Sequence, residues 1–313
     1  MTTWKVLISD GLSDKGIAIL GSAAQVDDKP DISADDLTKV AGEYDAIVVR
    51  GRTKVTSAVF DVAKRLKVVG RAGVGVDNID LTAARSHGVT VVNAPKSTSL
   101  AVAELAVAMM FALARMLPKA DATMKQGQWI KKQLEGIELN GKTLGIVGMG
   151  NIGTALAQRA AALGMKVIGY DTLVPAEEIK KRGAEPVALG DLYARSDFIS
   201  FHLPLTPESK GMINGQVFAQ MKRGVRIIDA ARGGILDETA LLAALESGQV
   251  AAAALDVYAT EPPGLTALVA HPNVVATPHI GAQTEEAQVR AAEDIASEVL
   301  NALRGEPLRW KIV

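Results

Sequence analysis

The sequence predicts an α/β protein with two doubly wound parallel-sheet domains and a cleft between them. Short runs rich in Val and Ile alternate with polar or helical stretches along most of the 313 residues. Such alternation is typical of parallel strands joined by helices that cover both faces of a sheet. A glycine-rich turn between a strand and a helix, at residues 148–153, supports the same fold. The length also agrees, because it allows two cores of ordinary domain size.

The first domain is predicted from four apolar runs in the N-terminal third. The expected strands span residues 4–8, 46–49, 66–69 and 89–92, and helices are expected at 35–41 and 81–87. A long apolar helix at 100–117 follows a Ser-Thr-Ser run of candidate caps and is expected to end near Pro118. Its apolar residues surround nearly the whole helix, which favours burial between domains or subunits.

In the second domain, the nucleotide-binding unit is predicted to begin at about Gly141, after a more polar segment at 119–138. A helix is expected at 154–163, and strands are expected at 144–147, 166–170, 198–201, 225–228, 253–257 and 274–276. A last helix at 285–303 brings the chain back to the first domain. We therefore expect a discontinuous substrate domain, 1–98 plus 290–313, and a nucleotide-binding domain, 99–289.

The run Gly-Met-Gly-Asn-Ile-Gly at 148–153 has the spacing of a dinucleotide-binding loop. In such a loop the first glycine makes the tight turn, the second lets backbone approach a pyrophosphate, and the third lets helix and strand pack closely. The helix N-terminus offers N–H groups to the phosphates. Asp171, 18 residues after Gly153, ends the next strand, where a carboxylate hydrogen-bonds the adenosine ribose. The pattern predicts a Rossmann-like domain that binds NAD; a glycine turn in another kind of α/β protein is the alternative.

A second strand runs into a glycine loop at residues 66–75. Its G-x-G motif is incomplete, and no acidic residue ends the following strand. Two interpretations stay open: a glycine turn in a second α/β domain, or a cradle of backbone N–H groups for a small anion.

Charge balance and the absence of cysteine exclude several functions. The 34 Lys and Arg against 35 Asp and Glu give a net charge of −1, so no nucleic acid or membrane partner is expected. Without a long apolar run or a charged-then-apolar leader, the expected location is the cytoplasm. The lack of cysteine excludes disulfides, thiolate catalysis and Cys-ligated zinc. No metal is expected, because the four histidines lack metal-site spacing: His87, His202, His271 and His279.

Three expected strand ends in the last third carry Arg232, Glu261 and His279. Ligands of parallel sheets bind at the carboxyl ends of the strands, so we expect these side chains at one edge. Hydride transfer between a nicotinamide and a 2-hydroxy acid needs such a set. A histidine takes the hydroxyl proton, a carboxylate fixes the imidazole tautomer, and a guanidinium holds the substrate carboxylate. Each residue taken alone has a structural alternative: a salt bridge, a turn cap or a structural histidine.

At these residues the sequence resembles the D-isomer-specific 2-hydroxyacid dehydrogenases. The resemblance covers almost the whole chain, through Val-Arg at 49–50, Val-Val-Gly-Arg-Ala-Gly-Val-Gly-Val-Asp-Asn at 68–78, Glu-Leu-Asn-Gly-Lys-Thr-Leu-Gly at 138–145, Ala-Arg-Gly-Gly at 231–234, Ala-Leu-Asp-Val at 254–257, Glu-Pro-Pro at 261–263 and Pro-His at 278–279. It implies a flavodoxin-like substrate domain, a Rossmann-like NAD domain and a homodimer. It also implies that Arg232 orients the substrate, Glu261 pairs with the histidine and His279 is the acid/base.

The resemblance implies further site residues by position. Those at cofactor positions are Gly148, Gly150, Asn151, Ile152, Gly153, Asp171, His202, Thr206, Ala230, Arg232, Asp256, His279 and Ala282. Those at substrate positions are Arg50, Val74, Gly75, Asn93 and Lys131. The segment around Lys131 can, in the family, reach a neighbouring subunit's active site. His202 is expected to line the cofactor and not to carry the proton.

Within the family, the resemblance is strongest to the branch that acts on D-3-phosphoglycerate in serine biosynthesis. It implies NAD-dependent oxidation to 3-phosphohydroxypyruvate, with 3-sulfolactate, glyoxylate and hydroxypyruvate as alternative substrates of the same reaction class. A phosphate or sulfonate needs an additional cation near the glycine loop. The candidates are Arg50, Arg52, Lys54, Lys131 and Lys132. A solvated basic face is the alternative interpretation of these clusters.

Two departures from the family pattern affect these expectations. Some members carry a C-terminal amino-acid-sensing domain, whereas this chain stops at Val313, so a short form without serine feedback is expected. A position that is often Thr in the glycine loop is Val74 here, which removes a hydroxyl but leaves the backbone N–H groups. A redox-silent protein that senses NAD(H) is the alternative from another functional class. It predicts loss of the Arg, Glu and His set, which this chain retains.

Overall fold

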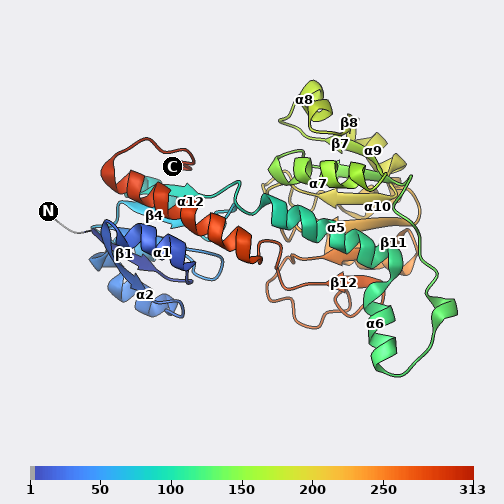
Figure 1. Cartoon of the computed structure of the whole chain (residues 1–313), viewed down its shortest axis with the longest axis horizontal. Coiled ribbons are helices and arrows are strands. Elements are labelled where there is room, and N and C mark those ends of the chain that lie inside the picture. Colours follow the sequence, from blue (N-terminus) through green and yellow to red (C-terminus); the bar gives the residue numbers. More distant parts are fainter. Residues whose placement is uncertain (1–3) are drawn as a thin grey trace. The chain divides into compact units, whose positions relative to one another are not determined.

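The computed structural model describes residues 4–313 and forms two compact units. Unit 1 comprises Met1–Ser99 and Ala282–Val313, and unit 2 comprises Leu100–Gly281. Each unit contains one sheet whose named strands pair in parallel, with helices in the connections (Figure 1). The prediction of two Rossmann-like α/β domains is therefore confirmed.

Unit 1 has a five-stranded sheet in the order β2-β1-β3-β4-β5. Its strands are β1 (Trp4–Ile8), β2 (Ala24–Asp28), β3 (Ala46–Val49), β4 (Val68–Arg71) and β5 (Thr90–Asn93). One face is covered by α1 (Asp14–Gly21) and α12 (Glu285–Arg304), and the other by α2 (Ala34–Val40), η1 (Ala41–Glu43), α3 (Ser57–Val62) and α4 (Leu81–Ser86). Each face of this sheet packs in its own hydrophobic core, and alternate residues of β1 belong to the two cores. Val6 and Ile8 face α1 and α12, whereas Leu7 faces α2 and α3.

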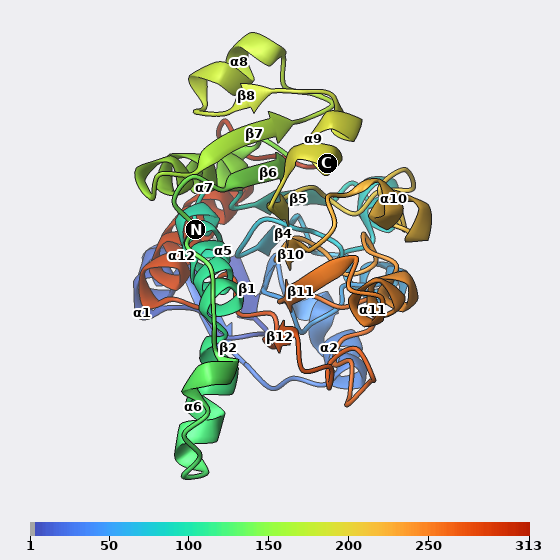
Figure 2. The same cartoon turned by 90° about the vertical axis from the view of Figure 1, so that its right-hand side faces the viewer.

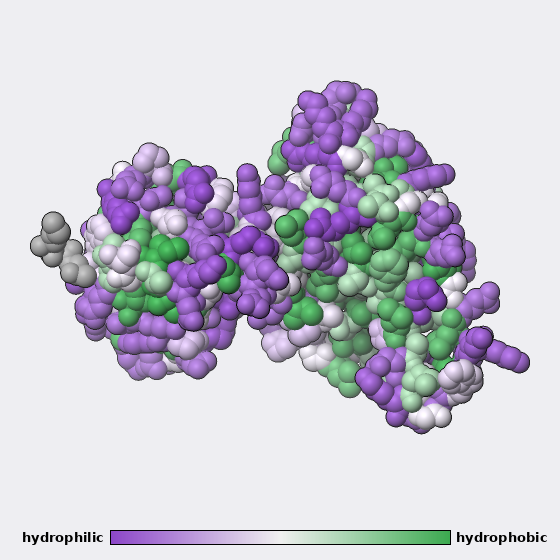
Figure 3. All heavy atoms as spheres, viewed as in Figure 1, coloured by the Kyte–Doolittle hydropathy of each residue, from purple (hydrophilic) through white to green (hydrophobic). Residues whose placement is uncertain are grey.

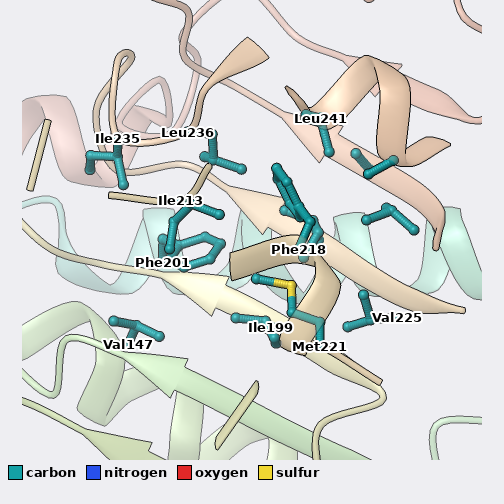
Figure 4. Packing of buried hydrophobic residues seen from close by; sticks show 14 of the residues in the cluster. Val147, Ile199, Phe201, Ile213, Phe218, Met221, Val225, Ile235, Leu236 and Leu241 are labelled. Carbon is teal, nitrogen blue, oxygen red and sulfur yellow. The ribbon is translucent and has the colours of Figure 1, made fainter. Parts of the chain in front are cut away.

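Unit 2 has a seven-stranded sheet in the order β12-β11-β10-β9-β6-β7-β8. Its strands are β6 (Thr143–Val147), β7 (Lys166–Tyr170), β8 (Glu185–Pro186), β9 (Phe198–Phe201), β10 (Val225–Asp229), β11 (Val250–Leu255) and β12 (Val274–Ala276). Helices α5 (Ser99–Arg115) and α7 (Asn151–Ala162) share one core, and α9 (Leu189–Arg195), α10 (Gly215–Gln220) and α11 (Glu238–Glu246) share the other. Figure 4 shows part of the second core, where Phe201, Ile213 and Phe218 gather on the sheet.

The strand order of unit 2 reverses direction between β6 and β9, which lie side by side. Later strands extend the sheet beyond β9, while β7 and β8 extend it on the side of β6. Ligands of open parallel sheets bind outside the carboxyl ends of the strands at such a switch point. The chain leaves these two ends at Gly148 and His202, so this edge is the natural position for a nucleotide.

The long apolar helix differs from its expected form at its C-terminal end. It ends at Arg115, and Met116 takes a left-handed conformation with φ of 52°. Pro118 does not end it; the proline lies in the first turn of a second helix, α6 (Leu117–Lys125), where a missing N–H costs nothing. Helix α6 thus overlaps the beginning of the segment 119–138, for which only a polar character was expected. It extends away from the sheet of unit 2 (Figure 2), and the same segment also contains η2 (Lys131–Gln133).

Several other boundaries moved because tertiary packing overrides local preference. The strand expected at 66–69 is β4, and it includes Gly70, where a Cβ would come within 2.6 Å of Val299 on α12. The strand expected at 253–257 begins at Val250 and ends at Leu255, because its alanines carry no strand signal of their own. Besides α6 and η2, the elements that were not expected include β2, β8, α1, α3, α8 (Ala176–Lys181), α9, α10 and α11.

No single helix in residues 4–313 is long and apolar enough to cross a bilayer. Helices α5 and α6 together have the length and composition of a span, but they are bent by 65° at the break between them.

Candidate active site

The glycine loop of unit 2 is built by close backbone contacts. Gly148 has φ of 100°, and a Cβ there would overlap the carbonyl of His202. A Cβ on Gly153 would overlap the carbonyl oxygen of Gly148, so the first turn of α7 lies directly against the end of β6. By contrast, a Cβ on Gly150 would meet no atom within 4 Å. The loop is therefore tight at its two ends and open at its middle glycine, where a pyrophosphate could approach the backbone.

Asp171 lies against this loop at the end of β7. Its Oδ2 accepts a hydrogen bond from the N–H of Met149 at 2.7 Å, and its Oδ1 accepts from the N–H groups of Leu173 and Val174 at 2.8 and 3.1 Å. Arg182 supports the same turn, because its Nη1 donates to the carbonyl oxygen of Met149 at 2.6 Å. The carboxylate is thus held beside the loop by backbone donors.

His279 and Glu261 form a direct pair. The distance from His279 Nδ1 to Glu261 Oε2 is 2.8 Å, and Glu261 Oε1 accepts from the N–H of Tyr258 at 3.1 Å. Both carboxylate oxygens are engaged, which fixes the carboxylate plane. The two side chains are 46% and 37% exposed, so Nε2 of the imidazole can be reached from outside unit 2. Because Glu261 occupies Nδ1, any proton exchanged with a ligand must pass through Nε2.

The segment carrying His279 is held by Asp256, a role that the sequence does not reveal. Asp256 accepts hydrogen bonds from Thr277 Oγ1 at 2.6 Å and from the N–H groups of Ile280 and Gly281 at 2.8 Å each. These bonds flank His279, whose φ of 54° is unusual for a residue with a side chain. Asp256 is 1% exposed, and in this structure its carboxylate binds the His279 loop. Ala282, the last cofactor position expected, follows this loop at the start of the second segment of unit 1.

Tyr258 and Glu238 stabilise the neighbouring loop and were also not expected. The Tyr258 hydroxyl lies 3.0 Å from the carbonyl oxygen of Leu255 and 3.1 Å from that of Thr277, so it bridges the ends of β11 and β12. Glu238, in the first turn of α11, accepts from the N–H of Ala259 at 2.7 Å. Only their position near the expected strand ends could have suggested them.

Arg232 lies on the loop after β10, next in the sheet to β11. Its Nη1 donates to the carbonyl oxygen of Ala231 at 2.6 Å. A Cβ on Gly233 would overlap the carbonyl of Tyr258, so the Arg232 loop and the Glu261 loop touch backbone to backbone. The three strand ends of β10, β11 and β12 therefore bring Arg232, Glu261 and His279 to the same edge of one sheet.

Asp229 is a buried carboxyl group at the end of β10, three residues before Arg232. It is 1% exposed, and burial raises its pKa from 3.8 to about 7, while the N–H of Ala231 and the charge of Arg232 act in the opposite direction. Its Oδ1 accepts from that N–H at 3.0 Å. Asp256 and Glu238 are the other charged groups acting on it, and both raise its pKa further.

Substituting Asp229 with asparagine should change stability in a pH-dependent way. An acid whose pKa is raised in the folded state stabilises the fold below its unfolded pKa, and this contribution is lost as pH rises from about 4 to about 7. Asparagine does not titrate. The free energy of unfolding of the variant should therefore rise by about 1 to 3 kcal/mol relative to that of the wild type as pH increases from 5 to 8. Thermal unfolding over a pH series measures this. A difference that stays constant with pH would contradict it.

His202 follows β9 at the edge of the glycine loop and is unsuited to acid/base work. Its Nε2 lies 2.8 Å from Ser200 Oγ, and burial lowers its pKa to about 4. The ring is therefore neutral near pH 7. Farther along the same loop, the N–H of Thr206 donates to Ser209 Oγ at 2.7 Å, and Ala230 is buried beside Asp229.

The expected substrate residues Arg50, Val74, Gly75 and Asn93 belong to unit 1. Asn93 Nδ2 donates to the carbonyl oxygen of Val74 at 2.7 Å and so supports the second glycine loop. The backbone N–H of Arg50 donates to Asp10 Oδ2 at 2.7 Å, and burial lowers the pKa of its guanidinium. Lys54, Lys131 and Lys132 are exposed.

Arg52 is already engaged within unit 1 and is a poor candidate for binding a substrate anion. Its guanidinium donates to the carbonyl oxygens of Ser9, Pro30 and Ile32 at 2.6, 2.6 and 3.1 Å. It also pairs with Asp10 at 3.3 Å.

Among residues 4–313, no three His, Asp or Glu side chains gather as a metal site would require.

Comparison with known proteins gives consistent findings. The model of the D-isomer specific 2-hydroxyacid dehydrogenase NAD binding domain matches residues 107–281. D-3-phosphoglycerate dehydrogenase of Synechocystis is 47% identical over 308 residues, 98% of this chain and 56% of the relative, and the human enzyme is 47% identical over 305 residues, 97% and 57%. This chain thus spans little more than half the length of these relatives.

Solved structures agree over the whole chain. A glyoxylate reductase from Paecilomyes thermophila superimposes with a TM-score of 0.90 at 31% identity and covers 100% of this chain and 99% of its own. D-lactate dehydrogenase from Escherichia coli gives a TM-score of 0.87 at 28% identity and covers 99% and 100%.

Proposed function

Because this chain belongs to the D-isomer-specific 2-hydroxyacid dehydrogenases, we propose that it oxidises D-3-phosphoglycerate to 3-phosphohydroxypyruvate with NAD. The observation that carries the proposal is the hydrogen-bonded pair of His279 and Glu261, on strand ends beside the loop of Arg232. That set suits any 2-hydroxy acid. The choice of 3-phosphoglycerate is supported by the names of the relatives that are 46–48% identical to this chain.

The residues of unit 2 fit NAD. The open middle glycine and the N-terminus of α7, a helix of 12 residues, would bind the pyrophosphate, and Asp171 would accept hydrogen bonds from the adenosine ribose. NAD, when bound, accepts the hydride from C2 of the hydroxy acid. A carboxylate beside the ribose repels a 2′-phosphate, so we expect NAD to be preferred to NADP.

The side chains then divide the remaining work. His279 takes the hydroxyl proton at Nε2 as C2 loses its hydride, and its Nδ1–H stays bound to Glu261. Glu261 stabilises the positive charge that develops on the imidazole. Arg232 holds the C1 carboxylate and polarises the C2 oxygen, which becomes the carbonyl. The reverse reaction uses the same groups, with His279 as the acid.

The appearance of NADH absorbance with a panel of acids tests the proposal. D-3-phosphoglycerate should give the highest kcat/KM, above D-lactate, D-glycerate and 3-sulfolactate, and NADP should be a poorer acceptor. A preference for an acid without a distal anion would replace this proposal with a glyoxylate or hydroxypyruvate reductase. Binding of NADH without turnover of any acid would favour the NAD(H)-sensing function.

Arg50→Ala should separate phosphorylated from unsubstituted acids. Its guanidinium can hold a phosphate at the far end of a three-carbon acid, whereas glyoxylate has no anion there. Loss of this charge-assisted contact should raise the KM for 3-phosphoglycerate by about 1.5 to 3 kcal/mol, or roughly ten- to a hundredfold. KM for glyoxylate or hydroxypyruvate should change little. An equal loss on every acid would make Arg50 a general carboxylate clamp or a structural residue.

A second copy of this chain is the protein partner that we propose. Large apolar side chains on α5, α6 and the segment after them are exposed: Phe111 at 38%, Leu117 at 52%, Met124 at 56% and Trp129 at 78%. In Figure 3 hydrophobic residues also cover much of the visible face of unit 2. Such surface is typical of an interface. The adjacent Lys131 and Lys132 would then approach the partner's substrate site. Sedimentation at micromolar concentration should show a dimer.

A further inference from the structure

The Arg50 guanidinium of unit 1 is partly buried, yet its charge is not paired with a carboxylate. Its only side-chain hydrogen bond among the described residues joins Nη2 to Oε1 of Gln283 at 3.2 Å. Gln283 lies in the same unit, between Ala282 and the start of α12. The carboxylate that acts on the charge of Arg50, Asp10, accepts a hydrogen bond from the backbone N–H of Arg50 but forms its ion pair with the guanidinium of Arg52. The Arg50 guanidinium thus lies near a carboxylate without forming an ion pair with it.

A neutral partner has a specific effect on this guanidinium. An amide oxygen restricts the rotamers of Arg50 through one N–H and leaves its full charge and its other donors for a ligand. A carboxylate at the same position would hold the side chain equally well, but it would cancel the charge. Burial already disfavours the charged guanidinium, as the lowered pKa of Arg50 indicates, so an anionic ligand would relieve an existing cost.

We propose that Gln283 is a specificity-determining residue that orients Arg50 toward the anionic group at the far end of the substrate. Gln283 could also donate a hydrogen bond from its Nε2 amide to the oxygens of that anionic group. The inference rests on the proposed function, since it names how a phosphorylated or sulfonated three-carbon acid is distinguished from an unsubstituted one. Arg50 provides the charge, and Gln283 keeps that charge available.

The test compares Gln283→Glu and Gln283→Ala with Gln25→Glu, which adds the same charge at an exposed position of β2. In the reductive direction with NADH, Gln283→Glu should raise the KM for 3-phosphohydroxypyruvate by at least about tenfold with little change in kcat, and Gln283→Ala should raise it less. KM for hydroxypyruvate should change less than about twofold, and Gln25→Glu should behave as the wild type. In an Arg50→Ala background, Gln283→Glu should add almost nothing. Equal effects on both substrates, or full additivity with Arg50→Ala, would overturn the proposal.

A binding measurement separates this inference from the proposed activity. With NADH present, 3-phosphoglycerate should raise the Tm of the wild type and of Gln25→Glu, but not that of Gln283→Glu. If the wild type binds 3-phosphoglycerate without turning it over, the proposed function fails and the inference stands. If Gln283→Glu binds it as well as the wild type does, or if the wild type does not bind it, the inference fails.

Discussion

His279→Ala is expected to lower kcat by about 10²- to 10⁴-fold, with every acid that the protein turns over, and to leave NADH binding nearly unchanged. The His279 imidazole is bound to Glu261 through Nδ1 and can present Nε2 to the acid, whereas the other histidine of this edge, His202, is buried and stays neutral. Single-turnover rates measure the chemical step, and fluorescence titration measures NADH binding.

Glu261→Gln is the matched control for this prediction. The amide oxygen can still accept from Nδ1–H of His279, so the ring keeps its orientation, but the negative charge opposite the developing imidazolium is lost. We expect a smaller loss of kcat, about 10- to 100-fold. If His279→Ala kept most of its turnover, or if Glu261→Gln were the more damaging change, the proton carrier would have to be another group.

Arg232→Ala should lower kcat/KM roughly 10²- to 10³-fold on phosphorylated and unsubstituted acids alike. This corresponds to a loss of about 3 to 4 kcal/mol of transition-state stabilisation. All of them share the C1 carboxylate that Arg232 is proposed to hold, so the loss should not depend on what lies at C3. This pattern is opposite to that expected of Arg50. Initial rates with 3-phosphoglycerate, glyoxylate and hydroxypyruvate measure the difference.

Arg232→Lys keeps the charge and loses the planar fork of donors, so its kcat/KM should fall between those of the wild type and the alanine variant. The Tm should show that both variants are folded, because the backbone contact between Gly233 and Tyr258 holds the loop in place. A loss confined to phosphorylated acids would show that Arg232 binds the distal anion and not the C1 carboxylate.

The features that local patterns encode could be predicted from the sequence. Strands 4–8, 46–49, 166–170, 198–201 and 274–276 match the structure residue for residue, because their apolar runs are short and clearly bounded. The spacing from the glycine loop to Asp171, and the placement of Arg232, Glu261 and His279 on adjacent strand ends, follow from parallel topology.

The remaining features depend on contacts between distant segments. The edge strand β2 has the sequence Ala-Gln-Val-Asp-Asp, which is short and has only one β-branched residue beside two aspartates, so its strand signal is weak. Pro118 is equally compatible with the end of one helix and the start of the next, and the left-handed Met116 decided between them. Asp256 and Gln283 show no motif for their hydrogen bonds, because their partners are fixed only when the loops have folded. Arg50 and Arg52 lie two residues apart, and the sequence offers both as candidates for binding an anion. Only the structure shows that the Arg52 guanidinium is already bound to backbone carbonyl oxygens.

The contact between Gly233 and the Tyr258 carbonyl limits how this protein could be altered by directed evolution. No side chain fits at position 233 without separating the two loops, so even alanine should damage activity on every substrate at once. A library aimed at a new substrate should therefore leave position 233 unchanged. Under the proposed function, the positions to vary are Arg50, Val74 and Gln283 of unit 1, because none of them is proposed to transfer the proton or to bind NAD.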